Sequence, residues 1–446
     1  MRLERERPDG RRDFWDARVN DATLVIRTGI VNMKQRVSEK HYPSAKDANA
    51  ALEKIAADKR KQGFGEPIIL GAKFLPGKFP RNPALEAAIR EDRSEGPCSV
   101  YADWLQAQGS PAGEVMALAT AIAKKRSDAR KQARLDELAL ELLLPTTDYA
   151  TWTWNHGIWA SLKLENLEDW MDDKFDAVTL ANKLFATPFC VALQELHLGI
   201  LRWDYNSTDV PAVLDAAGGH AWAKGLARLH LGEIGENIDM AHQAVGDVGG
   251  VISLAFPKLQ HLKVHSGERA ANDTFSLAGL ALPKLETLIV ETCAMTKPRL
   301  DAILRAKLPS LKRLELWFGA SDRDAGASLD DLAPLLDGSV FPKVTHLGLK
   351  NLDFTGPLTE ALYGSKIAPR LVELDLSMGT LDGDYVTDFY VHAANFKKLR
   401  VLNVDDNFLT PRELRELRGS FKAKVVSEGQ PKLDDGDEGR FVSVAE

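Results

Sequence analysis

The most regular feature of the chain is a hydrophobic pattern, Leu-x-x-Leu-x-Leu, in which Val also occurs. Eight copies begin between Leu193 and Leu399 at intervals of 26 to 33 residues, and a weaker copy begins 34 residues earlier, at Trp159. Apolar and polar positions alternate in each copy, which predicts a strand with its leucines on one face and the intervening residues on the other. Because one strand cannot bury its leucines alone, the pattern predicts that successive copies stack around a shared core.

This pattern resembles that of leucine-rich repeat proteins. The resemblance implies an α/β leucine-rich repeat solenoid of about 8–9 repeats over residues 150–420, with strands lining a concave face and a helix or irregular arc outside. The longer repeats have room for helices such as 209–217 and 329–336, and 411–419 resembles a closing helix. We expect a tryptophan cluster, Trp152, Trp154 and Trp159, to cover the other end of the core. Residues 421–446 are predicted to form an acidic, disordered tail.

The first 66 residues carry 15 basic and 11 acidic side chains. Residues 1–13 are charged and expected to be disordered. Strand patterns at 14–19, 23–27 and 36–42 precede a helix at 48–61, which follows a capping-box sequence beginning at Ser44.

The order of these elements in residues 14–66 resembles the small α+β WGR domain. The resemblance is carried by Phe14-Trp15, Arg27-x-Gly29, Tyr42-Pro-Ser44 and the segment from Lys59 to Phe64. In that family a Trp-Gly-Arg signature follows the second strand, and in poly(ADP-ribose) polymerases it packs against a DNA end. The matching positions here are Thr28, Gly29 and Ile30, which lack the stacking ring and the guanidinium that DNA-end binding needs most.

Residues 67–81 are rich in Pro and Gly and are predicted to be a linker. Helices are expected at 83–91, 98–108, 111–125 and 129–144 within a module spanning 82–145. The sequences Tyr101-Ala-Asp-Trp-Leu105 and Gly109-x-Pro111-x-Gly113-Glu114 resemble the bacterial repeat-companion domain, a short helical module that precedes repeat arrays. We interpret its Asp103, Trp104 and Glu114 as structural, with Trp104 in the core and both carboxylates at helix ends.

The polar residues between and after the leucines define a candidate binding surface on the concave face. Five of the ten histidines fall on these positions, basic residues occur in the earlier copies and acidic residues in the last ones. Trp317 is an aromatic residue of the type that anchors interfaces. The candidate partner-binding residues are His197, Arg228, His230, His261, Lys263, His265, Arg313, Glu315, Trp317, His346, Lys350, Glu373 and Asp375.

Neither a metal nor a cofactor is expected. His197 and His230 are neighbours, but only Glu195 could add a ligand to them, while His261 and His265 lie roughly 13 Å apart along one strand. A pH-sensitive contact at these histidines remains an alternative. Phosphate-binding loops, dinucleotide-binding loops, zinc-protease motifs and serine-hydrolase motifs do not occur, so we do not expect an enzyme.

Composition limits the cellular compartment and the classes of partner that we expect. A net charge of −7 does not favour nucleic-acid binding by the whole chain, and three scattered cysteines fit a reducing cytoplasm. The charged N-terminus is not a signal peptide, and no apolar run is long enough to span a membrane.

Two functions follow as expectations. The first is a cytoplasmic bacterial adaptor that binds an unidentified protein through the concave face, with no small-molecule substrate. The alternative is a regulator that binds DNA ends or RNA through basic residues of the WGR-like domain. Those residues are Arg27, Lys34, Arg36, Lys40, Lys59, Arg60 and Lys61.

Overall fold

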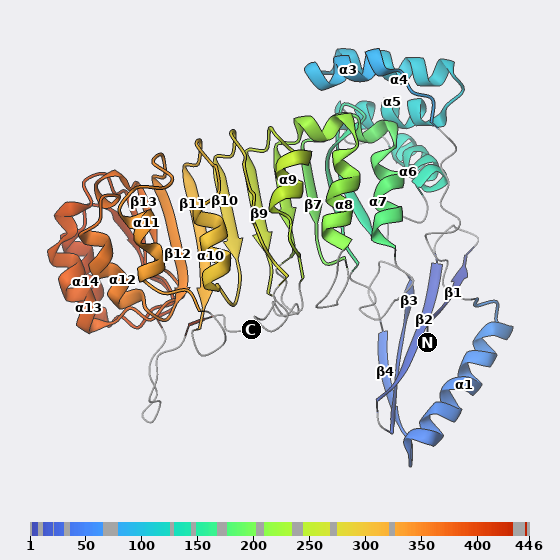
Figure 1. The fold of residues 1–446 in the computed structure, drawn as a ribbon. Helices are drawn as coiled ribbons and strands as arrows, with labels where there is room; N and C mark the ends of the chain where they lie inside the picture. Colours follow the sequence, from blue (N-terminus) through green and yellow to red (C-terminus); the bar gives the residue numbers. More distant parts are fainter. Residues whose placement is uncertain are drawn as a thin grey trace. The chain divides into compact units, whose positions relative to one another are not determined.

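The computed structural model describes most of the chain. The described residues are 2–7, 12–20, 22–30, 36–65, 79–124, 129–143, 149–166, 176–201, 209–233, 244–267, 274–320, 326–430 and 442–443. They divide into two compact units (Figure 1). Unit 1 comprises Met1–Pro76, Leu140–Tyr149 and Asp173–Asp176, and unit 2 comprises Gly77–Ala139, Ala150–Asp172 and Ala177–Glu446.

The described part of residues 1–76 in unit 1 forms an antiparallel sheet and helix α1. The strands are β1 (Arg2–Glu6), β2 (Arg12–Asn20), β3 (Thr23–Ile30) and β4 (Arg36–His41), in spatial order β1-β2-β3-β4. Helix α1 (Ala45–Lys61) begins at Ser44, whose side chain accepts from the Asp47 amide. The core cluster is Leu3, Trp15, Ala17, Leu24, Ile26, Ala56 and Phe64. The hairpin, third strand and helix are thus confirmed, whereas β1 lies in the segment expected to be disordered.

Four helices open unit 2, at or near the positions predicted for them. They are α3 (Pro83–Glu91), α4 (Glu95–Ala107), α5 (Pro111–Lys124) and α6 (Ala129–Leu143), the last of which extends past the boundary of the unit. Glu86 on α3 is buried and accepts from Arg81 and from the Tyr101 hydroxyl. Burial opposes its ionisation, but the hydrogen bond and charge of Arg81 outweigh burial and lower the pKa of Glu86.

The residues singled out in this helical module have structural contacts. Trp104 is half-buried and stacks on Tyr101, with 6.0 Å between the ring centroids. Glu114 lies in the first turn of α5, at a helix end as expected, and also pairs with Arg134 on α6 at 3.0 Å, whereas Asp103 is exposed.

An 11-stranded sheet forms the centre of unit 2, with its strands in chain order from β5 to β15. Strand β5 pairs antiparallel with β6, and all later neighbours pair parallel. The strands are β5 (Ala150–Asn155), β6 (Ile158–Leu164), β7 (Glu195–Leu198), β8 (Arg228–Leu231), β9 (His261–His265), β10 (Thr287–Glu291), β11 (Arg313–Gly319), β12 (His346–Leu352), β13 (Glu373–Asp375), β14 (Val401–Asn403) and β15 (Lys424–Val426).

The hydrophobic pattern explains the register of this sheet. The middle leucine of each copy pairs with the middle leucine of the next, from Leu162 on β6 to Leu402 on β14, and all of these side chains are buried. Each leucine therefore covers the next, and burying a leucine side chain contributes about 1.5–3 kcal/mol. The predicted stacking around one core is confirmed.

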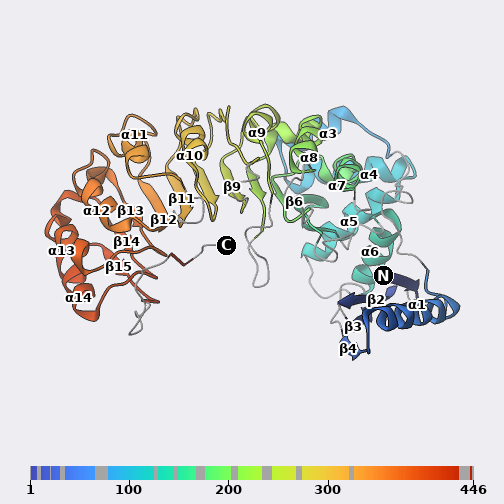
Figure 2. The ribbon, with the colours of Figure 1, turned by 60° about the horizontal axis from the view of Figure 1, so that its bottom comes forward.

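Helices cover one face of the sheet (Figures 1 and 2). The α-helices are α7 (Ala177–Phe185), α8 (Asp209–Gly218), α9 (Gly249–Ala255), α10 (Lys297–Leu304), α11 (Ala333–Leu336), α12 (Thr355–Tyr363), α13 (Gly383–Val391) and α14 (Pro411–Ser420). Short 3-10 turns at Pro188–Cys190, Ala221–Gly225, Asp330–Leu332, Ala368–Arg370 and Ala393–Asn395 complete the connections. Among the described residues, the connection from β9 to β10 has no helix.

The predicted fold class is wrong. The chain is not the expected leucine-rich repeat solenoid of about 8–9 repeats but a mixed α/β protein with one large, mostly parallel sheet. The pattern identifies the strands that pair, but it does not identify what extends the sheet. An antiparallel strand, β5, begins the sheet, and β15, which lacks the pattern and lies in the predicted acidic tail, ends it. The connections also differ from strand to strand, so the copies are not equivalent units.

Aromatic rings close the β5 end of the sheet. Trp152 stacks on Trp159 with 5.1 Å between centroids, and Trp154 meets Phe189 edge-on at 5.4 Å. Trp159 and Phe189 are fully buried. The expectation that these tryptophans cover this end of the core is confirmed.

Candidate partner-binding face

The candidate binding residues lie on the face of the sheet opposite helices α7–α14, which we call the helix-free face because no described helix covers it. Strand register arranges them in three rows across the sheet. The first row is Glu195, Arg228, His261, Thr287, Arg313, His346 and Glu373, the second is His197, His230, Lys263, Ile289, Glu315, Gly348 and Asp375, and the third includes the pairs His265–Glu291 and Trp317–Lys350. Parallel pairing thus places on one face residues as far apart in the sequence as Glu195 and Glu373, which lie at the two ends of the first row.

Three histidines form a cluster on strands β7, β8 and β9. The ring centroids of His197 and His230 are 5.5 Å apart, and those of His230 and His261 are 5.3 Å apart. Burial lowers the pKa of all three, and for His230, which also faces the other two rings, the pKa falls to about 4. The cluster is therefore neutral near pH 7.

Lys163, Glu165 and Glu233 extend this cluster, and the sequence analysis did not select them. Lys163 on β6 pairs with Glu165 at 2.7 Å and with Glu233 at 2.8 Å, and Glu233 also lies 3.1 Å from His197 Nε2. The alternation that selected the other candidates also applies to the weak first copy, where Lys163 lies between two leucines and Glu165 follows the second, so it could have indicated both. Glu233 lies two residues beyond the last leucine of its copy and is outside that pattern.

One candidate residue, His265, is buried beneath an ion pair in the centre of the helix-free face. Glu291 pairs with Lys263 at 2.8 Å and with His265 Nδ1 at 3.2 Å. His265 is 2% exposed, so it supports Glu291 from below and is not accessible to a partner. Burial opposes ionisation of Glu291, but hydrogen bonds from His265 and Lys263 outweigh it and lower the pKa of Glu291.

A network around Trp317 occupies β11, β12 and β13. The half-buried indole donates from Nε1 to Glu315 at 2.9 Å, and Lys350 Nζ lies 4.9 Å from the centroid of the ring. Lys350 is also 3.5 Å from Glu315 and 3.8 Å from Asp375. These contacts fix the orientation of the ring while leaving part of it accessible.

A bidentate ion pair spans three strands beside this network. Arg313 on β11 donates to both carboxylate oxygens of Glu373 on β13, at 2.8 and 2.7 Å. The hydrogen bond from Arg313 lowers the pKa of Glu373 and keeps it ionised. His346 lies between them in the register, and its pKa is lowered by burial and by Arg313. Basic residues of the earlier copies and acidic residues of the later copies, such as Arg313 and Glu373, are therefore paired on the helix-free face.

The described His, Cys, Asp and Glu side chains were the candidates for a metal site, and the cysteines for a reactive thiol. Within the described residues, no group of three or more His, Cys, Asp or Glu side chains is arranged to hold a metal ion. The three cysteines are buried thiols outside any disulfide, and burial raises the pKa of Cys98 to about 11. A buried thiol with a raised pKa is a poor nucleophile.

The described basic residues of the alternative nucleic-acid surface lie in two places in unit 1. Arg36 and Lys40 are exposed on β4, one edge of the unit 1 sheet. Lys59 lies 4.9 Å from the Phe64 ring and Lys61 pairs with Asp58 at 3.1 Å, near the end of α1 where Arg5 of the opposite edge strand contacts Gln62. Arg60 is exposed beside them. Lys34 and the side chain of Arg27 lie outside the described part of the chain.

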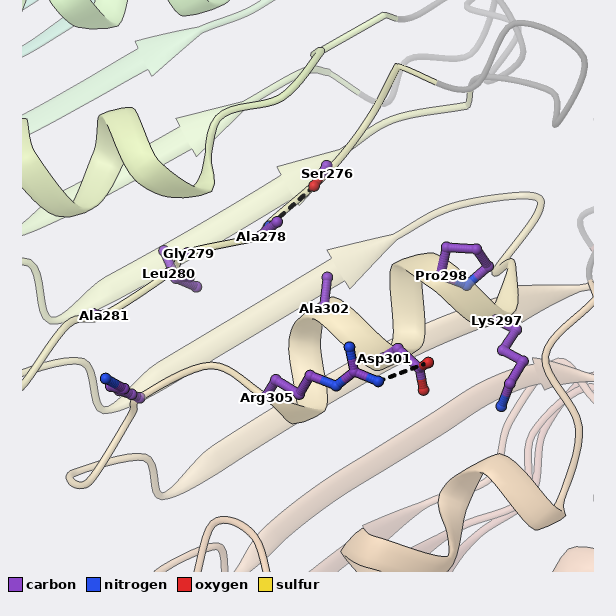
Figure 3. A pocket seen from close by; sticks show the side chains of 11 residues that line it. Ser276, Ala278, Gly279, Leu280, Ala281, Lys297, Pro298, Asp301, Ala302 and Arg305 are labelled. Carbon is purple, nitrogen blue, oxygen red and sulfur yellow. Dashed lines mark hydrogen bonds and ion pairs between the residues drawn. The ribbon is translucent and has the colours of Figure 1, made fainter.

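A hollow of 610 Å³ lies on the helix-covered side, next to the helix-free connection between β9 and β10 (Figure 3). Gly279, Leu280 and neighbouring small residues form one wall, and α10 forms the other. Two of its three cations are already paired, since Arg305 reaches Asp301 at 3.3 Å and Lys297 pairs with Asp331, while Lys307 is the third. These carboxylates offset two of the three positive charges.

Within the described residues, no helix combines the length and hydrophobicity needed to cross a membrane. No family model and no curated protein matches the chain. Among solved structures it is similar to a crystal structure of a Bacteroides fragilis protein, a structural-genomics target, at 16% identity and a TM-score of 0.49, with 100% of this chain and 99% of that chain covered.

Proposed function

We propose that the protein is a non-enzymatic adaptor of the cytoplasm that binds a protein partner through the helix-free face. The observation that carries the proposal is the network around Trp317, an oriented and partly accessible indole surrounded by paired charges. Aromatic and arginine residues dominate the energetics of protein interfaces, especially when their orientation is fixed before binding. Three buried cysteines that form no disulfide support a reducing compartment.

The position of the network on the sheet adds support. Trp317, Lys350 and Arg313 lie on adjacent strands near the middle of the order β5–β15, so a partner can reach side chains on several strands at once. Ile289 adds a partly exposed apolar side chain one strand away. An anchor with a polar surround is the usual composition of a non-obligate interface.

The geometry favours this adaptor over the nucleic-acid alternative. The described basic residues of unit 1 lie at opposite edges of its sheet, and Lys59 and Lys61 already have partners. A phosphate backbone is bound by several cations that act together. The test for this alternative is salt-dependent retardation of nicked or ended DNA by the full chain.

The adaptor is tested by affinity capture from native lysate followed by binding assays with the purified candidate. Wild type is compared with the double variant Trp317→Ala/Arg313→Glu, which removes the anchor and places a carboxylate beside Glu373. Arg305→Glu is the matched control, because Arg305 is 80% exposed on the helix-covered side. We expect the double variant to bind its partner at least ~30-fold more weakly.

Two results would reject the proposal. One is a partner that binds wild type and the double variant equally. The other is an equal loss with Arg305→Glu, which would place the contact elsewhere. Thermal unfolding of each variant distinguishes loss of binding from loss of fold.

A further inference from the structure

A second cavity, of 490 Å³, lies between α3 and the segments that lead into strands β7, β8 and β9. All of its lining residues belong to unit 2, and none is part of the helix-free face. Four basic side chains line it, Arg90, Arg93, Lys224 and Lys258, against one carboxylate, Glu91. We propose that this cavity binds a small anion carrying one or more phosphate groups.

Arg93 is the central group of this site. Its guanidinium is half-buried and is held by neutral acceptors only. The Ala192 carbonyl accepts from Nε at 3.3 Å. When the Gln194 amide is flipped, the orientation that satisfies both of its ends, its oxygen accepts from Nε at 3.1 Å and from Nη2 at 2.8 Å. Burial without a compensating carboxylate lowers the pKa of Arg93. Within the described residues, no ion pair neutralises this cation.

The backbone leaves room for the guanidinium. A Cβ atom at Gly225 would lie 3.3 Å from Arg93 Nη2, which is tighter than ordinary van der Waals contact. A glycine at this position therefore lets the arginine reach the cavity. The guanidinium is oriented before a ligand arrives, which is the arrangement that favours bidentate recognition of phosphate.

The remaining cations have no carboxylate partner among the residues that the structure describes. Lys224 donates to the carbonyls of Leu254 and Ala255, and no described ion pair involves Arg90 or Lys258. Like charges around one cavity repel one another, and an anionic ligand removes this repulsion. The hollow beside α10 differs in this respect, because Asp301 and Asp331 pair with two of its three cations.

The lining also limits the kind of ligand. Apart from the charged residues, it consists of Ala87, Gln194, Ala221, Gly225, Ala227 and Gln260. No aromatic side chain is present to stack on a nucleobase, whereas the two amides can bind oxyanions or hydroxyl groups. The volume is within the range of small-molecule sites. The chemistry fits inorganic phosphate or pyrophosphate, or a sugar phosphate.

Isothermal titration of the full chain tests the proposal, with inorganic phosphate, pyrophosphate and ribose 5-phosphate as separate probes at matched ionic strength. The variant is Lys258→Glu, an exposed side chain that can be changed without disturbing the core. Lys284→Glu is the matched control, because Lys284 also follows a proline one copy later, is exposed, and lies outside the cavity. Arg93→Gln is the second variant.

We expect the tightest-binding probe to lose at least ~10-fold in affinity with Lys258→Glu and to stay within about twofold of wild type with Lys284→Glu. Arg93→Gln should abolish binding in protein whose circular dichroism is that of wild type. Preference for ribose 5-phosphate over both inorganic ions would identify an organic phosphate as the ligand. The proposal is overturned if no probe binds wild type at millimolar concentration, or if both lysine variants weaken binding equally.

Discussion

At the scale of single residues, His230 shows how the sheet changes the chemistry of a side chain. Its Nε2 is buried and has no hydrogen-bond partner among the described residues, and histidine rings lie on both sides of it. Burial, together with His197 and His261, lowers its pKa to about 4. The ring is therefore held in the neutral form by its position in the register, which a list of sequence positions does not reveal.

This shift makes the stability of the protein depend on pH. An unfolded histidine has a pKa of about 6.5, so between that value and about 4 the unfolded chain binds a proton that folded His230 does not. Acidification through this window therefore favours unfolding. We expect His230→Gln to lose less of its free energy of unfolding than wild type between about pH 7 and 4.5, measured by urea denaturation.

His41→Gln is the control for this measurement, because His41 is exposed on β4 and belongs to unit 1. If wild type and His230→Gln lost the same free energy on acidification, the cluster would not be the source of acid sensitivity.

At the scale of elements, buried polar side chains hold the segments that follow the strands. Asn407, after β14, is fully buried and donates to the carbonyls of Leu376, Val404 and Asp405. Its amide oxygen accepts from the Leu381 backbone at 2.9 Å. One side chain thus satisfies backbone groups of two successive connections, so their spacing depends on it.

Replacing Asn407 should therefore destabilise unit 2 more than replacing a polar side chain that makes one partly exposed hydrogen bond. Asn407→Ala leaves buried donors and acceptors without partners, and we expect a decrease of about 2–4 kcal/mol in the free energy of unfolding. Asn407→Asp should cost a similar amount, because a carboxylate cannot donate to the three carbonyls. Asn395→Ala, which removes one partly exposed hydrogen bond to Tyr363, should cost about 1 kcal/mol or less. Equal losses from Asn407 and Asn395 would contradict this account.

Local signals predicted the elements well. Pro83, preceded by Asn82, begins α3 and the predicted bounds 83–91 match, because proline at the first turn and a capping side chain act within a few residues. The leucine pattern likewise identified every strand from β6 to β14. The fold class was wrong because β15, Lys424-Val-Val426, lacks the pattern, and nothing local indicates that β5 pairs antiparallel.

The candidate site was predictable only in part. Alternation placed Trp317 and Arg313 on the helix-free face. The ion pair of Arg313 with Glu373, however, joins β11 to β13 across β12 and links residues 60 positions apart. Its geometry depends on side-chain reach as well as register. The basic cavity was not predicted at all, since it combines α3 with segments more than 100 residues away. Contacts of this kind depend on tertiary packing and leave no periodic signal.

At the scale of the whole molecule, the chain has two separate cores. In unit 1 the core is the cluster around Trp15 and Phe64, and in unit 2 it is the column of buried leucines that includes Leu288. Division into compact units with their own cores is the usual condition for separate cooperative unfolding. Unit 1 has the smaller core, so we expect it to unfold first on heating.

Scanning calorimetry of two core variants tests this independence. Trp15 is 1% exposed, and Trp15→Ala should cost about 3–5 kcal/mol in unit 1 and lower only the first transition. Leu288 is fully buried, and Leu288→Ala should cost about 2–5 kcal/mol in unit 2 and lower only the second. If either variant shifted both transitions together, the two units would share one cooperative fold, and the stability of the binding face would then depend on unit 1.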